Sequence, residues 1–435
     1  MKIFSISLGC PKNLVDAERL LFAFGLDFQP AETPEEADCV LINTCSFITP
    51  AVEESVQTIL ENARRIKDLT PRPPLVVAGC LVSRYKQEDL ALEMPEVDLW
   101  LSPAQLEDWP SMLVRLFKEK SGGLAGSVQG RRLSTGPSYA YLKISEGCRH
   151  RCSYCLIPDI RGRDIVSRPL PELLDEARFL LEQGVSEIIL VAQDLTAWGD
   201  DLGLKHGLRE LLPAFCRLEG LKRLRLMYLH PSGLNKAMLS FMADLPPPFL
   251  PYFDLPFQHS HPEMLRLMNR PLSPSPRRMV ELIREHLPEA ALRSTLITGF
   301  PGEKEEHFAD MLDFVKTAQF MHLGVFTWQA EEGSAAFSLP ERVNKSLAGA
   351  RRRSLLLRQL GISRRLLAGL LGQDMDILVE RPQGEWPGLY IGRAWFQAPE
   401  VDGVVYVSGP GVIPGSMVRA RVEESRDYDL TAMVL

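Results

Sequence analysis

The sequence lacks any hydrophobic run of the roughly 18 residues that a membrane-spanning helix needs, and it has no low-complexity tract. Its first apolar run is short and is followed by Pro11-Lys12-Asn13, so we expect that this stretch is not a signal peptide. A basic surplus is missing as well, since the formal net charge is −7 over 435 residues. These absences argue against a membrane protein, a secreted protein and a nucleic-acid binder. We expect a cytoplasmic chain of about two to four domains, with no membrane contact and with a basic partner.

Eight cysteines are present, and in a reducing compartment they are better explained as ligands or core thiols than as disulfides. Cys148, Cys152 and Cys155 follow an apolar run that ends at Gly147, and their gaps of three and two residues let the thiolates converge on one metal centre. Three thiolates are one ligand short of a closed site, which suits a cluster that keeps one iron open. The alternative is a zinc site completed by His150, which would have to bend back within the same short loop.

Three further cysteines follow predicted strands in the first segment of the chain. Cys10, Cys45 and Cys80 are each 35 residues apart and come just after short apolar runs. Helical spacing between the runs predicts a parallel sheet with crossover helices, so the three thiols should share one carboxyl edge. We therefore predict a shared metal site, the alternative being three buried thiols. Cys39, inside a strand, and Cys216, in a helical stretch, are expected to be core residues. The predicted strands are Lys2–Leu8, Cys39–Asn43 and Leu75–Ala78.

The second segment follows Ser121–Ser138, which is rich in Gly and Ser and is predicted to be a linker or a long connecting loop. Six strand candidates with helical patterns between most of them predict a partial (βα)6 barrel, whose active site should lie at the carboxyl ends of its strands. Gln193 and Asp194 stand at the end of the second strand and are candidate cofactor contacts. The candidates are Tyr139–Ile144, Glu187–Ala192, Arg223–Leu229, Tyr252–Phe257, Arg293–Thr298 and His322–Trp328.

From Asp374 the apolar residues alternate, and Gly and Pro separate five short runs. This pattern predicts a small antiparallel β-barrel. Ten acidic side chains against five basic ones give the segment a net charge of −5. Such a barrel should repel phosphates and attract a basic polypeptide.

The pattern Cys148-x-x-x-Cys152-x-Tyr154-Cys155, placed after the first strand of a β-α barrel, resembles the radical S-adenosylmethionine (SAM) superfamily. The resemblance implies a [4Fe-4S] cluster that binds SAM at its open iron. Tyr154, Gln193, Asp194 and Gly299 are then the expected cofactor-binding residues. Gly299 begins a GFPGE turn that lacks the Gly-Lys-Ser/Thr element of a phosphate-binding loop.

Two three-cysteine sets followed by a β-barrel are similar to the methylthiotransferase family over essentially the whole chain. The resemblance implies an α/β chain with three domains and two [4Fe-4S] clusters: an N-terminal domain at 1–120 with Cys10, Cys45 and Cys80 on an auxiliary cluster, a radical SAM core at 134–370, and an OB-like TRAM barrel at 373–435. GCPKNLVDAE at Gly9–Glu18 resembles the RimO-type branch, and so do Ala192–Gly199 and Tyr390–Gly403. Departures from the family pattern are Lys304, Trp328-Gln329-Ala330 and Ala394-Trp395-Phe396-Gln397.

That branch implies transfer of a methylthio group to the β-carbon of an aspartate in ribosomal small-subunit protein twelve. One SAM would methylate a sulfur on the auxiliary cluster, and a second would yield the 5′-deoxyadenosyl radical that removes a hydrogen atom. The implied partners are this basic protein or the ribosomal subunit, and an external one-electron donor such as a flavodoxin. A monomer is expected, and no catalytic residue beyond the cluster ligands is assigned. The alternatives are tRNA adenosine methylthiolation and a non-catalytic iron–sulfur or zinc protein that docks on ribosomes.

Overall fold

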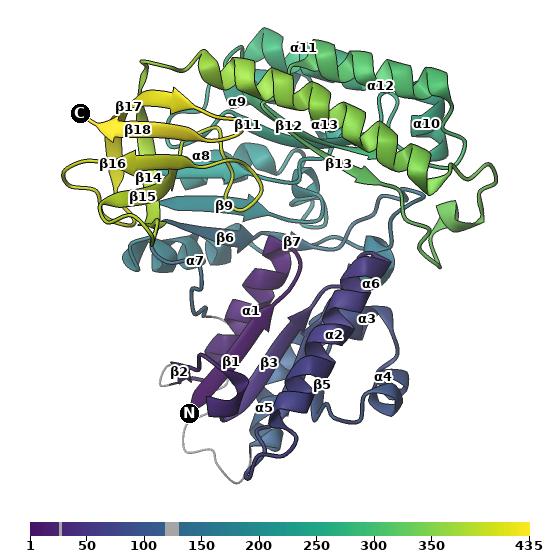
Figure 1. Cartoon of the computed structure of the whole chain (residues 1–435), viewed down its shortest axis with the longest axis vertical. Coiled ribbons are helices and arrows are strands. Elements are labelled where there is room, and N and C mark those ends of the chain that lie inside the picture. The colour runs from purple at the N-terminus through teal and green to yellow at the C-terminus, as the bar shows by residue number, and fades with distance from the viewer. Residues whose placement is uncertain (26–27, 118–129) are drawn as a thin grey trace. The chain divides into compact units, whose positions relative to one another are not determined.

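The computed structural model describes residues 1–25, 28–117 and 130–435, and its contacts form two compact units (Figure 1). The first contains 1–134 together with two short segments, 146–150 and 155–164. The second contains 135–145, 151–154 and 165–435. Among the residues described, no helix is both long and apolar enough to cross a membrane.

The first unit is built on a five-stranded parallel sheet in the order β2-β1-β3-β4-β5. Leu20, Phe24 and Trp109 pack on one face of this sheet, and Ile59 and Leu90 belong to the core of the other. The order reverses between β1 and β3, where doubly wound folds bind ligands. The three predicted strands are confirmed. The elements are β1 (Lys2–Ser7), α1 (Pro11–Ala23), β2 (Gln29–Pro30), β3 (Cys39–Thr44), α2 (Thr49–Ile66), β4 (Leu75–Gly79), α3 (Cys80–Arg84), α4 (Gln87–Glu93), β5 (Leu99–Leu101) and α5 (Trp109–Leu116).

Residues 121–129 of the predicted linker Ser121–Ser138 lie outside the described residues. Residues 130–134 pack within the first unit. Arg131 is buried and donates to the Glu18 carboxylate of α1. Ser134 donates its N–H and its hydroxyl to the same carboxylate, at 2.8 and 2.6 Å. Residues 130–134 contain no helix or strand, as expected of a connecting loop, and they pack on one buried acidic side chain of α1 instead of forming a flexible linker.

The second unit begins with all six predicted strands, arranged as two three-stranded parallel sheets, β10-β9-β6 and β11-β12-β13. Among the described residues, an isolated parallel bridge joins Leu224 of β10 to Phe249, which precedes β11. The predicted partial barrel is confirmed. The strands are β6 (Tyr139–Lys143), β9 (Glu187–Val191), β10 (Arg223–Leu226), β11 (Tyr252–Gln258), β12 (Ala291–Thr298) and β13 (His322–Thr327), with a minor pair β7 (Ser145–Glu146) and β8 (Val166–Ser167).

Helices alternate with these strands, and the amphipathic α11 buries Met279, Val280 and Ile283. The longest helix, α13, leads from the six-stranded core to the C-terminal barrel (Figure 1). The helices of this unit are α7 (Leu170–Glu182), α8 (Leu208–Cys216), α9 (Lys236–Ala243), α10 (Pro262–Leu267), α11 (Pro276–His286), α12 (Glu305–Ala318) and α13 (Lys345–Ala368), whereas α6 (Ile157–Arg161) belongs to the first unit.

The C-terminal strands close into a barrel in the order β14-β15-β16-β18-β17, as the alternating pattern predicts. The pairings are antiparallel except that of β16 with β18, which is parallel. The all-antiparallel prediction is corrected at this pair, because the segment between β16 and β18 contributes β17 on the other side of β18. The strands are β14 (Asp374–Pro382), β15 (Leu389–Arg393), β16 (Val405–Ser408), β17 (Met417–Ser425) and β18 (Leu430–Val434).

This barrel packs against the amino-terminal ends of the core strands (Figure 1). Arg223, the first residue of β10, donates to the carbonyl oxygens of Arg393 at 2.9 Å and Asp376 at 2.7 Å. The Tyr252 hydroxyl, at the start of β11, donates to Asp402 at 2.7 Å. Because the cysteine loop leaves the carboxyl end of β6, the barrel lies at the opposite edge from that loop.

One buried carboxylate, Glu187 at the start of β9, accepts hydrogen bonds from two arginines at this interface. Arg225 Nε lies 2.6 Å from Glu187 Oε1, and Arg393 Nη2 lies 2.8 Å from Oε2. All three side chains have 1% or less of their surface exposed. Burial by itself would raise the pKa of Glu187, but the charges of Arg225, Arg393 and Arg223 bring it down to about 2.

Candidate metal centres

The N-terminal cysteines lie where successive parallel strands end. Cys10 precedes α1 and is its N-cap, Cys45 follows the last residue of β3, and Cys80 is the first residue of α3, directly after β4. Because β1, β3 and β4 are parallel neighbours, all three thiols belong to the same carboxyl edge. Cys39 lies within β3 and is fully buried, as a core thiol should be, whereas Cys216 ends α8 and is only half-buried.

Two glycines with positive φ allow these turns to approach one another. A Cβ at Gly9 (φ +91°) would lie 2.8 Å from the Cys45 Cβ and 3.0 Å from its Sγ. A Cβ at Gly79 (φ +101°) would lie 2.4 Å from Asn43 Oδ1. Both positions need glycine for conformation and for space. The turn before Cys10 is therefore in contact with Cys45.

Buried polar side chains connect the three turns. Asn13 donates its amide to the carbonyl oxygens of Leu8 at 3.0 Å and Thr44 at 2.7 Å. Asn43 donates to the Asn13 carbonyl at 2.6 Å. The Cys80 thiol lies 3.5 Å from Asn13 Oδ1. One asparagine thus contacts the ends of two strands and the cysteine that follows a third, which fixes the geometry of the edge.

The three thiols differ in acidity. Burial would raise the pKa of Cys10, but the Lys12 charge and the backbone N–H of Asn13 more than offset it, so the pKa is lowered. Burial raises the pKa of Cys45 to about 11. It raises that of Cys80 too, against the opposing charge of Arg161. Without metal, Cys10 is the thiol most ready to ionise, and metal binding would deprotonate the other two.

The loop of the second cysteine motif is held by contacts on both sides. Gly147 has φ +87°, and a Cβ there would lie 2.0 Å from the Asp164 carbonyl oxygen. The Cys148 N–H donates to the Gly162 carbonyl at 3.0 Å, and the Ile157 N–H lies 3.4 Å from Cys155 Sγ. The glycine before the motif is thus required by the closeness of the returning chain.

Within the second unit, the middle of the same loop is anchored on the segment after α10. Ser153 donates its N–H to the Met268 carbonyl at 3.0 Å and its hydroxyl to the Leu267 carbonyl at 2.7 Å. Arg270 Nη1 lies 3.6 Å from Cys152 Sγ, and its Nη2 donates to the Pro256 carbonyl at 2.6 Å. Cys152 is therefore presented beside a buried, fixed positive charge.

The four predicted cofactor-binding residues have structural contacts of their own. Tyr154 packs in an apolar cluster that includes Met264, Met268 and Phe300. Asp194 is buried and caps a short 3₁₀ helix by accepting from the Thr196 N–H at 2.9 Å.

Gln193 follows β9 at its carboxyl end, beside Asp194. A Cβ at Gly299 (φ +74°) would lie 2.3 Å from the Ala348 Cβ, so this glycine permits close packing of α13. SAM contacts at all four residues stay predictions.

Histidines near the carboxyl edge of the core accept hydrogen bonds from backbone N–H groups. His261 Nδ1 accepts from the Glu263 N–H at 3.3 Å, and His307 Nδ1 accepts from the Lys304 N–H at 3.2 Å. His259 Nδ1 likewise accepts from Ser260 and His261, and burial lowers its pKa to about 3.

The departures from the family pattern lie in packed or capping positions. Phe396 and Gln397 are buried, and the Phe396 carbonyl is 2.7 Å from His322 Nε2, at the start of β13. Trp328 packs edge-on against Phe300, with ring centroids 6.0 Å apart. The backbone N–H of Lys304 is capped by His307, so its side chain is not needed as a cap. These substitutions alter packing inside the second unit.

Sequence reasoning missed Asn13, Arg161 and Arg270. Arg161 and Arg270 each donate to a sulfur of a predicted ligand, Cys80 and Cys152 respectively. For Arg161 the available signal was its position six residues after Cys155, but its partner Cys80 lies 81 residues away in the sequence.

The donor sets fit iron–sulfur clusters. Each set consists of three thiols: those of the N-terminal set come from three strand ends, and those of the second set come from one loop. Soft thiolates select iron–sulfur clusters or zinc over hard cations. The lowered pKa of Cys10 favours its thiolate, which is the ligating form. Buried guanidinium groups donate to the sulfurs of Cys80 and Cys152.

Family models match three segments of the chain: the uncharacterized protein family UPF0004 at 2–102, the radical SAM superfamily at 142–315 and the TRAM domain at 371–435. Among solved structures, the radical SAM methyltransferase TsrM from Kitasatospora setae is 16% identical with a TM-score of 0.54, covering 75% of this chain and 74% of that one. This likeness concerns the fold.

Relatives named ribosomal protein uS12 methylthiotransferase RimO match along the entire chain. The protein of Oleidesulfovibrio alaskensis is 52% identical over 434 residues, covering 100% of both chains. That of Nitratidesulfovibrio vulgaris is 53% identical, again over 100% of both chains. That of Aquifex aeolicus is 43% identical over 99% of this chain and 96% of its own. The chain therefore belongs to the RimO methylthiotransferases of the radical SAM superfamily.

Proposed function

We propose that this protein transfers a methylthio group to the β-carbon of an aspartate in ribosomal protein uS12. The observation that carries the proposal is the second thiol triad, Cys10, Cys45 and Cys80, at one carboxyl edge of the N-terminal sheet. A radical SAM enzyme that only generates a radical needs the single triad Cys148, Cys152 and Cys155. A second thiol-only site supports a second [4Fe-4S] cluster, and with it sulfur transfer.

When bound, a SAM-binding cluster supplies a radical able to abstract hydrogen from an unactivated C–H bond, and an auxiliary cluster supplies sulfur. The protein's own residues hold the ligands in place. Ser153 ties the cysteine loop to the Leu267 and Met268 carbonyls, and Arg270 keeps a positive charge beside Cys152. Asn13 holds the N-terminal turns at a fixed spacing.

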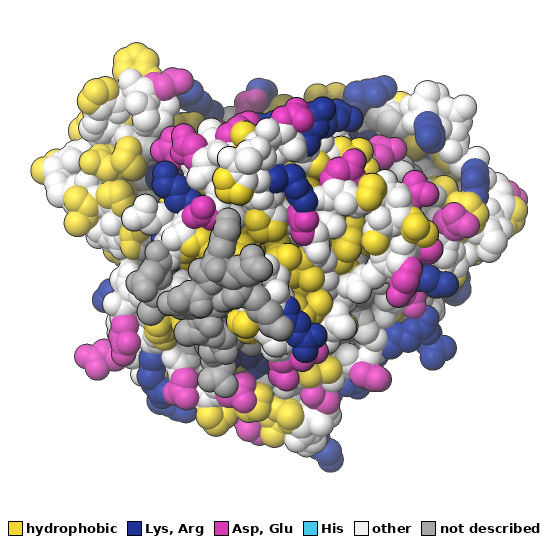
Figure 2. Space-filling view, turned by 90° about the horizontal axis from the view of Figure 1, so that it is seen from below, with side chains coloured by type: hydrophobic (Ala, Val, Ile, Leu, Met, Phe, Trp, Pro, Cys, Tyr) yellow, Lys and Arg dark blue, Asp and Glu magenta, His cyan; other side chains and the backbone are white. Residues whose placement is uncertain are grey.

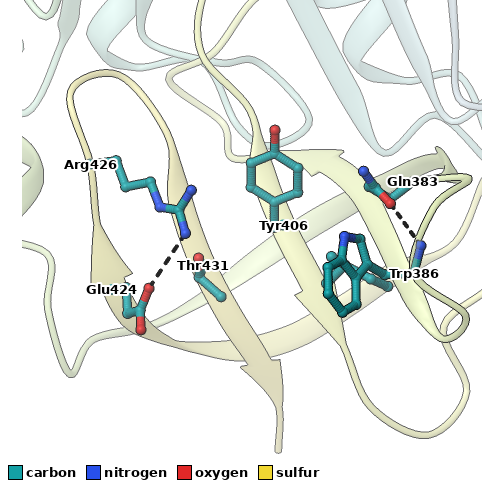
Figure 3. A pocket seen from close by; sticks show the side chains of 7 residues that line it. Gln383, Trp386, Tyr406, Glu424, Arg426 and Thr431 are labelled. Carbon is teal, nitrogen blue, oxygen red and sulfur yellow. Dashed lines mark hydrogen bonds and ion pairs between the residues drawn. The ribbon is translucent and has the colours of Figure 1, made fainter.

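The C-terminal barrel supports a protein substrate over a nucleic acid. Its net charge of −5 would repel a phosphate backbone. Its surface carries an open pocket where Trp386 is 67% exposed, and an ion pair of 4.0 Å joins Glu424 and Arg426 (Figure 3). Such a pocket suits a basic side chain, which an aromatic ring and a carboxylate can both contact. The labelled lining residues are Gln383, Trp386, Tyr406, Glu424, Arg426 and Thr431.

Surface charge elsewhere agrees with this choice. On the face seen in Figure 2, Lys and Arg side chains are interspersed with Asp and Glu and do not gather into one stripe. A substrate in the ribosomal subunit would place the enzyme in the cytoplasm. We further propose that an external one-electron donor reduces the SAM-binding cluster.

The test is anaerobic incubation of the iron-reconstituted protein with SAM, a reductant and either uS12 or tRNA. We expect uS12 to gain one methylthio group at an aspartate, and tRNA to remain unmodified. Modified adenosine in tRNA with unmodified uS12 would overturn the substrate assignment. Absence of 5′-deoxyadenosine in both reactions, with zinc in place of iron, would overturn the radical mechanism.

A matched control separates the two triads. Changing Cys10, Cys45 and Cys80 to Ala should leave 5′-deoxyadenosine formation intact and abolish methylthio transfer. Changing Cys148, Cys152 and Cys155 should abolish both reactions.

A further inference from the structure

Arg161 ends α6, six residues after Cys155, and its side chain lies against Cys80 of the other cysteine triad. Its Nε is 3.3 Å and its Nη2 3.2 Å from Cys80 Sγ, so two N–H groups of one guanidinium are directed at one sulfur. The side chain is 3% exposed. Leu156 and Ile160, from the same turn, pack on Cys80 as well.

The guanidinium is fixed by three further contacts. Its Nη1 lies 2.8 Å from Asp16 Oδ2 in α1 and 3.5 Å from Glu146 Oε2, just before Gly147. Its Nη2 also donates to Asn13 Oδ1. A planar guanidinium can make all these contacts at once, whereas a lysine ammonium is a single point donor on a flexible stem. The arrangement therefore depends on arginine as such.

Resting on the proposed function, we propose that Arg161 is a positioning residue for the auxiliary cluster, acting on it through the Cys80 sulfur. Its N–H groups orient the sulfur, and its charge stabilises the negative charge that a bound, reduced cluster carries. Hydrogen bonds and positive charge at cluster sulfurs raise the reduction potential. Because α6 follows Cys155 directly, the same side chain ties the turn after the SAM-cluster motif to the sulfur-donor site.

The experiment isolates the auxiliary site in the full chain. In a background with Cys148, Cys152 and Cys155 changed to Ala, iron can bind only at the N-terminal triad. The readouts are iron bound per chain, the rate of iron removal by a chelator and the reduction potential from an EPR-monitored titration. None of these depends on turnover.

The variants are chosen to keep the fold. R161M alone leaves Asp16 without its partner in the core, so R161M/D16N removes both charges together, and D16N alone keeps the arginine. R161K keeps the charge but not the forked donor. The matched control is R163M, two residues along the same turn, where the arginine is 66% exposed and pairs only with Asp159 at 2.6 Å among the ion pairs of the described residues.

We expect R161M/D16N to lose iron about 10- to 100-fold faster than the parent, as outer-shell substitutions at metal sites do. Its reduction potential should be more negative. R161K and D16N should be intermediate, because each keeps a positive charge beside Cys80 but loses part of its fixation, and R163M should resemble the parent. Rates and potentials in R161M/D16N equal to those of R163M would overturn the inference while leaving the auxiliary cluster in place. A background chain that binds no iron would overturn both.

Discussion

Glu187 should hold the C-terminal barrel to the core through its charge. The substitution Glu187→Gln keeps the shape of the side chain but removes the counter-charge of Arg225 and Arg393, which lie 2.6 and 2.8 Å from its oxygens. Both arginines are buried. Arg393 would keep its ion pair with Glu380, whereas Arg225 would lose the one ion pair it makes among the described residues and would remain charged and buried.

The magnitude follows from the pKa. Lowering the pKa of Glu187 from 4.5 to about 2 corresponds to about 3 kcal/mol of folding free energy at neutral pH. Breaking a buried ion pair from one side typically costs about 3–5 kcal/mol, in agreement. Because the pKa of the folded state is depressed, this stability is present above about pH 4.5 and is lost as the pH falls towards 2.

Hydrogen exchange followed by mass spectrometry measures the effect locally. Peptides from β14 and β15 should exchange about 100-fold faster in Glu187→Gln at pH 7, the equivalent of about 3 kcal/mol. The parent should lose this protection between pH 4.5 and 2, whereas the variant should change less over that range.

The control is Asp376→Asn, which removes an exposed pair with Arg419 at 3.3 Å and should leave exchange unchanged. If Glu187→Gln and Asp376→Asn exchange at the same rate, the barrel does not depend on this charge and the reasoning fails.

Three further predictions concern single side chains. Gly79→Ala should lower the amount of iron bound at the N-terminal triad, because the new Cβ would lie 2.4 Å from Asn43 Oδ1. The control is Gly136→Ala, at a glycine that also has positive φ but has open space around it. Equal iron contents in the two variants would contradict the prediction. In the metal-free protein at pH 7, iodoacetamide should label Cys10 before Cys45, since the pKa of Cys10 is lowered and that of Cys45 is about 11; mass spectrometry of the peptides decides. Trp386→Ala should raise the KM for uS12 without changing 5′-deoxyadenosine formation in its absence, and an unchanged KM would remove the pocket from substrate binding.

Much of this architecture could be predicted because the spacing of apolar residues along the sequence indicates the strands and helices. The strands before Cys10, Cys45 and Cys80 are short apolar runs, and the rule that parallel strands end at one edge then brings the thiols together. The family resemblance supplied the chemistry.

Long-range partners could not be predicted in the same way. The contact between Arg161 and Cys80 joins residues 81 positions apart, and no periodicity signals it. The parallel pairing of β16 with β18 and the packing of 130–134 on Glu18 depend similarly on the tertiary fold. The departures Phe396 and Gln397 are buried, and their burial depends on tertiary packing that the sequence pattern does not show.

The C-terminal barrel lies at the amino-terminal edge of the core strands, so the length of those strands sets a minimum distance between the barrel and the cysteine loop. Even the five-residue β6 measures about 17 Å from end to end at the usual rise per residue. A target that touches both the barrel and the end of β6 where the cysteine loop begins must span at least that length. Recognition at the barrel would then select for the size and shape of a folded ribosomal protein in its subunit. A short free peptide that carries only the target aspartate could contact the cysteine loop but would not reach the barrel.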